Sequence, residues 1–132
     1  MPTPEPCVYR FVPEIGELAR WCDAFIIAAA GGEKSRGVVD ADVIRAIGEH
    51  GVLVNVARGS IVIEAALLDA LSSGQLGGAG LEFAEEPHVP QALLELDNVV
   101  LQPHRASATV QPQLAIGQLP VTNLDAHFPA KR

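Results

Sequence analysis

Basic and aromatic residues are scarce in this sequence of 132 residues, which has nine lysines and arginines against 16 acidic residues and only 5% aromatics. The net charge of −7 argues against a nucleic acid or an anionic membrane as partner, because both bind clustered Lys and Arg. No apolar run reaches the length of about 18 residues that spans a bilayer. The first residues also lack the positive patch and apolar stretch of a secretory signal.

Cysteine is equally rare, since Cys7 and Cys22 are the only two. Their spacing fits neither a metal site nor a redox motif, so we predict no metal site. We expect two ordinary thiols in a reducing compartment, and therefore a cytoplasmic protein.

The sequence is rich in Ala, Val, Leu and Ile, which suit buried parallel strands with helices packed on them. Continuous apolar runs predict strands buried on both faces, and helical spacing with end signals such as Asp40 and Gly74 predicts the helices between them. Pro120 should kink or break the last helix near Leu119. The predicted strands cover residues 24–30, 51–56, 76–81 and 98–101, and residues 8–12 also fit a short strand. The predicted helices cover residues 14–21, 41–48, 63–71 and 108–128, with one or two helical turns at 90–96.

This alternation predicts an α/β fold, a partial doubly wound (Rossmann-like) parallel sheet of about four strands with flanking helices. We expect a single domain over residues 1–132. Glycines at 77, 78 and 80 indicate a close backbone approach along the third apolar run.

Three polar clusters follow predicted strands, where open α/β sheets bind their ligands. Arg58, followed by glycine, suits bidentate capture of a carboxylate, although it fits a surface turn equally well. The acidic loop at 82–87 taken alone is more typical of a solvated loop. His104 suits a general acid/base, although lone histidines are more often structural.

Taken together, the three clusters resemble the D-isomer-specific 2-hydroxyacid dehydrogenase family, which includes hydroxypyruvate and glyoxylate reductases. The resemblance covers about residues 8–128. It is carried by the order and spacing of three motifs, Asn55-Val-Ala-Arg-Gly, Gly80-Leu-Glu-Phe-Ala-Glu-Glu-Pro and Pro103-His-Arg-Ala-Ser-Ala-Thr.

The resemblance implies an NAD(P)-dependent oxidoreductase that reduces a 2-oxo acid to a D-2-hydroxy acid. Arg58 would hold the carboxylate of the substrate and polarise its carbonyl, and His104 would give a proton to the carbonyl oxygen. Glu86 would pair with His104 and orient its ring. The residues that would contact NAD or NADP are Ala29, Ala30, Val56, Ala57, Arg58, Glu82, His104 and Ala106.

The sequence also departs from the family pattern. It has no G-x-G-x-x-G turn followed by a helix, and Gly77-Gly-Ala-Gly80 is no substitute. We therefore expect the second half of a dinucleotide-binding domain, without the glycine-rich half and the substrate domain, and inactive alone. A non-catalytic remnant or interaction half-domain that binds no cofactor is the alternative. A different nucleotide-using class on the same sheet ranks third, because no Walker-type loop supports it.

The strand order that the resemblance implies would pair the strand at 24–30 with the missing first strand, so we expect this strand at an open edge of the sheet. An apolar edge strand invites pairing with another chain, so we expect a homodimer or aggregation through this edge.

Overall fold

The computed structural model describes residues 9–83, 89–103 and 109–128, which belong to two compact units that divide after Gln102. The first unit holds the sheet and its helices, and the second contains one long helix. In chain order the elements are α1 (Ile15–Trp21), β1 (Ala24–Ile27), η1 (Glu33–Ser35), α2 (Ala41–Ile47), β2 (Val52–Asn55), η2 (Gly59–Ile61), α3 (Glu64–Ser72), β3 (Gly78–Phe83), α4 (Gln91–Leu94), β4 (Val99–Pro103) and α5 (Val110–His127).

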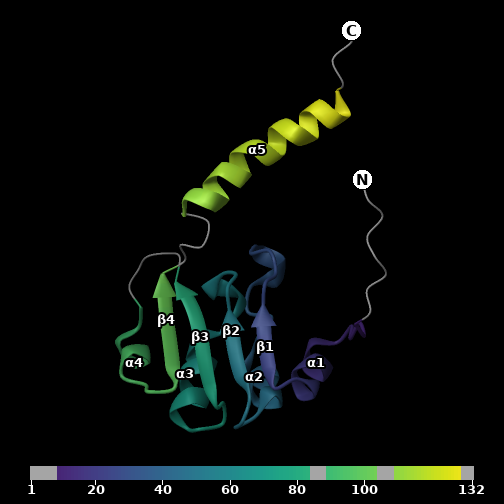
Figure 1. Ribbon diagram of the computed structural model, residues 1–132. Helices are drawn as coiled ribbons and strands as arrows, with labels where there is room; N and C mark the ends of the chain where they lie inside the picture. The colour runs from purple at the N-terminus through teal and green to yellow at the C-terminus, as the bar shows by residue number, and fades with distance from the viewer. Residues whose placement is uncertain (1–8, 84–88, 104–108, 129–132) are drawn as a thin grey trace. The chain divides into compact units, whose positions relative to one another are not determined.

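The four strands form one parallel sheet in the order β1-β2-β3-β4, as Figure 1 shows. The register brings Ile27 beside Asn55 and Asn55 beside Leu81, so β1, β2 and β3 reach the same edge of the sheet. A helix separates each strand from the next. The α/β, Rossmann-like prediction is confirmed, as is the edge position of β1.

Within the described part of the first unit, helices cover one face of this sheet. Phe25 and Ile27 on β1 and Leu53 on β2 are buried in a core with residues of α2 and α3, whereas Ile26 is 64% exposed. Figure 1 shows α2 and α3 behind the strands. The prediction that the first two apolar runs are buried on both faces is therefore wrong for β1 and for Val52 of β2. Consecutive strands joined in sheet order place their helices on one side, and no described helix of the first unit covers the other.

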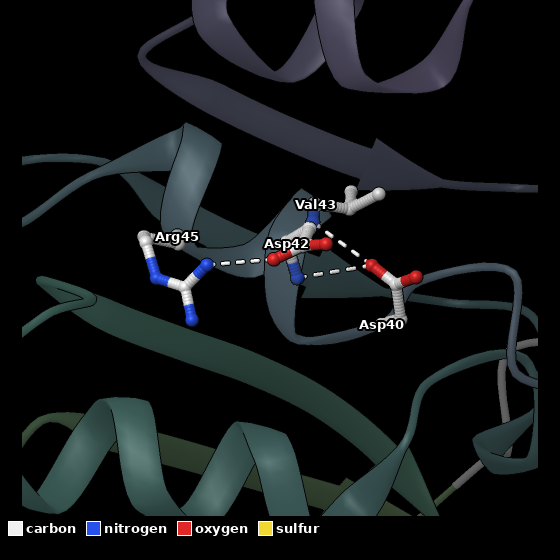
Figure 2. A network of polar contacts seen from close by, with 4 residues as sticks. All are labelled: Asp40, Asp42, Val43 and Arg45. Atoms are coloured by element: carbon white, nitrogen blue, oxygen red, sulfur yellow. Dashed lines mark hydrogen bonds and ion pairs between the residues drawn. The ribbon is translucent and has the colours of Figure 1, made fainter.

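Helix α2 begins where the sequence predicts. The carboxylate of Asp40 accepts hydrogen bonds from the backbone N–H groups of Asp42 and Val43, both at 3.0 Å, as Figure 2 shows. This N-cap satisfies two donors that the first turn leaves without partners. Arg45 pairs with Asp42 at 2.6 Å one turn later, on the exposed side of the helix.

The predicted close approach at the glycines is also present. A Cβ on Gly77 would lie 2.8 Å from the carbonyl oxygen of Glu49 and 2.9 Å from that of Gly51. A Cβ on Gly78 would lie 3.0 Å from the carbonyl oxygen of Asn98. Side chains at these two positions would push β2, β3 and β4 apart.

Two local predictions are wrong. Residues 9–12 form no strand, and the first strand in the described part of the chain is β1. Helix α5 continues through Pro120, so the prediction of a break near Leu119 is wrong. None of the helices over the described residues is long and apolar enough to cross a membrane.

Candidate functional site

The candidate site lies at the carboxyl end of the sheet, where β1, β2 and β3 end together. The loop after β1 carries Ala29 and Ala30, and both are exposed. The loop after β2 carries Arg58, which is also exposed. Glu82 is the residue after Leu81 on β3 and is half-buried. The structure therefore places the described candidates at one edge, as the sequence predicts.

Arg58 sits in a short loop whose shape is set by Asn55, the last residue of β2. Asn55 is 3% exposed and is the one buried polar side chain among the described residues. Its Oδ1 accepts a hydrogen bond from the backbone N–H of Ala57 at 3.0 Å, and its Nδ2 donates to the carbonyl oxygen of Arg58 at 2.9 Å. The amide thus closes the turn that leads from β2 to the arginine.

The side chain of Arg58 packs against the loop after β1. A Cβ on Gly31 would lie 2.6 Å from Cγ of Arg58 and 3.3 Å from its Cβ. Nη1 of the guanidinium donates to the carbonyl oxygen of Ala57 at 3.1 Å. Two loops from neighbouring strands therefore meet at this arginine.

A hollow opens along the ends of β2, β3 and β4. Its lining combines aliphatic side chains with the carboxylate of Glu82 and the amide of Gln102. Such a lining suits a flat ring that carries an amide group, because the ring packs on the aliphatic surface and the polar groups bond the amide. The lining residues are Val54, Val56, Gly80, Leu81, Glu82, Val100 and Gln102.

The remaining candidates differ in their placement. Val56 lines the hollow, whereas Ala57 is buried and its backbone N–H and carbonyl oxygen bond Asn55 and Arg58. Glu86, His104 and Ala106 lie outside the described residues, so their meeting with Arg58 stays a prediction. The described residues hold no group of three His, Cys, Asp or Glu side chains that would bind a metal ion.

Sequence reasoning assigned no role to Asn55 or Gly31. Asn55 could have been singled out, because an asparagine at the end of an apolar strand, where a loop begins, is typical of an Asx-turn. Gly31 carries no such signal, because its requirement arises from a residue 27 positions later in the chain.

Comparison with known proteins defines the class. Residues 3–106 match the D-isomer specific 2-hydroxyacid dehydrogenase family in its NAD binding domain. The chain belongs to this family, and the part it matches is the part that binds the dinucleotide.

Individual relatives agree with this assignment. The chain is 48% identical over 123 residues to the 2-ketogluconate reductase of Gluconobacter oxydans, covering 92% of this chain and 40% of the relative. It is 45% identical over 124 residues to glyoxylate/hydroxypyruvate reductase A HPR2 of Arabidopsis thaliana, with 93% and 40% covered. The chain therefore spans about two fifths of the length of these relatives.

A solved structure supports the same fold. The NADPH-dependent glyoxylate/hydroxypyruvate reductase of Sinorhizobium meliloti, in complex with NADP and malonate, matches with a TM-score of 0.81 at 44% identity. The match covers 97% of this chain and 41% of that protein. The sheet and helices described above therefore have the fold of about two fifths of that reductase.

Proposed function

We propose that this chain forms the substrate-binding side of the nicotinamide site in an NAD(P)-dependent oxidoreductase that reduces a small 2-oxo acid to a D-2-hydroxy acid. The observation that carries the proposal is the exposed Arg58, held by its loop at the carboxyl end of the sheet, the same end at which Val56 and Glu82 line the hollow. A guanidinium offers two parallel N–H donors to a carboxylate, which gives both charge and direction.

In this proposal each side chain has one task. Arg58 binds the carboxylate and draws electron density from the adjacent carbonyl, and His104 gives its proton to the carbonyl oxygen. Glu86 orients the imidazole of His104 for that transfer. When bound, the nicotinamide cofactor supplies the hydride.

The relatives support the substrate class. Their names describe the reduction of 2-ketogluconate, glyoxylate and hydroxypyruvate, which are all 2-oxo acids. The malonate bound to the Sinorhizobium meliloti enzyme is a small carboxylate as well. A small 2-oxo acid is therefore the substrate that we propose for the complete site.

Binding of oxalate tests the role of Arg58, because oxalate resembles a 2-oxo acid and does not react. Calorimetry should detect saturable binding by the chain and by the matched control Arg45→Ala, whose guanidinium is paired with Asp42. Arg58→Ala should lose about 1.5–3 kcal/mol of binding free energy, the value of a hydrogen bond to a charged group. Equal binding by all three proteins would contradict the proposal.

Turnover is a separate matter. A polypeptide of these residues contains no G-x-G-x-x-G phosphate loop, so we infer that it binds NADH and NADPH weakly and does not turn over alone. Oxidation of either cofactor with glyoxylate or hydroxypyruvate at micromolar protein would refute this inference. A cytoplasmic location stays a prediction that rests on the cysteine usage.

One observation favours a second role as an interaction module. β1 is an edge strand, and its Ile26 is 64% exposed. We infer pairing with a second copy through this edge. Light scattering should show concentration-dependent dimers that Ile26→Lys abolishes, and a monomer at high concentration would exclude the homodimer.

A further inference from the structure

The position of Arg58 depends on residues that do not themselves offer a group to a substrate. Asn55 fixes the backbone, since its amide bonds the N–H of Ala57 and the carbonyl oxygen of Arg58. Both bonds form around a side chain that is almost completely buried. A buried amide loses its bonds to water, so it holds strongly to the partners that replace them. The turn therefore has one preferred shape.

Gly31 packs against the side chain of Arg58 and limits its position. The short distances between Gly31 and the first two side-chain carbons of Arg58 leave no room for a methyl group. Gly31 is absent from the glycines with positive φ, whereas its neighbour Gly32 has a φ of 153°. Position 31 therefore requires glycine for the space it leaves and not for its backbone angles.

The Gly31 loop is itself held in place. The hydroxyl of Ser35 lies 2.9 Å from the carbonyl oxygen of Ala30 and 3.1 Å from that of Gly32. The two carbonyls flank Gly31, so the surface on which Arg58 rests is tied to η1. The backbone of Arg58 is held by Asn55 at the end of β2, and its side chain packs against this loop.

We propose that Asn55 and Gly31 are positioning residues that hold the Arg58 guanidinium in a preformed orientation for the substrate carboxylate. The proposal rests on the function proposed above for Arg58. A long flexible side chain loses conformational freedom when it binds, and this loss is smaller when the side chain is already ordered. The same contact joins the substrate arginine to the loop of Ala29 and Ala30, which is the predicted cofactor loop.

The experiment follows the Nε–H group of Arg58 by NMR in the intact chain, with sodium oxalate as the probe at constant ionic strength. The variants are Gly31→Ala and Asn55→Ala. Gly59→Ala is the control for the first, because a Cβ on Gly59 meets no atom within 4 Å. Asn98→Ala is the control for the second, because Asn98 donates its amide to the carbonyl oxygens of Leu71 and Gly77 at the other end of the sheet.

In the unmodified chain and in both controls, the Nε–H of Arg58 should show the heteronuclear NOE of an ordered group. Gly31→Ala and Asn55→Ala should lower this NOE and weaken oxalate binding at least about tenfold, as expected when a positioned group is displaced by a fraction of an ångström to an ångström. Gly31 is exposed, so Gly31→Ala should remain folded even where Asn55→Ala does not.

The two proposals fail in different ways. Unchanged NOE and unchanged oxalate affinity in Gly31→Ala would overturn the positioning role and leave the carboxylate site standing. An Arg58 signal that oxalate does not shift in the unmodified chain would overturn the carboxylate site. The loss of order in Gly31→Ala would then still decide whether Arg58 is positioned by this glycine.

Discussion

Ile26 and Ile27 are neighbours on β1 and have the same side chain, yet Ile26 is 64% exposed and Ile27 is 5% exposed. The difference follows from the alternation of a strand, since adjacent side chains point to opposite faces of the sheet. Helices α2 and α3 pack with Ile27 in the core, and no described helix of the first unit covers the face of Ile26. The comparison shows that the buried apolar side chains of β1 belong to one face of the sheet, whereas its other face exposes an apolar side chain.

Replacing each isoleucine by alanine tests this difference most strongly. Ile27→Ala should lower the free energy of unfolding by about 2–5 kcal/mol, because it removes buried methyl groups and leaves a cavity. Ile26→Ala should change it by less than about 0.5 kcal/mol, as surface substitutions do. Denaturant titration measures both values, and equal losses would mean that the second face is covered as well.

Helix α2 covers the first face and begins at the cap of Asp40. Asp40→Ala should cost about 1 kcal/mol, because the N–H groups of Asp42 and Val43 lose their common acceptor. The control Asp42→Ala breaks only an exposed ion pair and should cost less, within about 0–1 kcal/mol. Thermal unfolding of the two variants should rank them in this order, and the reverse order would contradict the cap.

The smallest effect concerns Cys22 at the end of α1. Burial raises the pKa of its thiol, and the nearby charge of Asp23 raises it further. The folded state therefore favours the neutral thiol, so this contribution to stability is fully present below the ordinary thiol pKa and is lost as the pH rises above it. In a Cys7→Ser background, alkylation of Cys22 should reach half its maximal rate at a higher pH in the folded chain than in urea. Coincident curves would contradict the shift.

Much of the fold follows from local sequence signals. The cap of Asp40, the left-handed glycine at 74 and the apolar runs around β1 and β2 are each readable from a few adjacent residues. The exposure of Ile26 was not predictable, because an apolar run does not reveal which of its faces has a partner. The proline rule predicted a break at Pro120 that the helix Val110–His127 does not have.

The candidate site also has a part that the sequence predicts and a part that only the structure shows. Arg58, Val56 and Glu82 come to one edge because parallel strands end there, which the strand pattern predicts. The contact between Gly31 and Arg58 joins two loops of different strands, and only the distance between them reveals it. Sequence therefore predicts which residue types gather at the edge, and three-dimensional contact determines how they are held.

The most direct test of the account is a crystal structure of the chain with oxalate. We predict one carboxylate of oxalate on the guanidinium of Arg58, with the imidazole of His104 at about 3 Å from the ligand, within reach of a proton transfer. The guanidinium of Arg58 and the imidazole of His104 on opposite sides of the molecule would contradict the account.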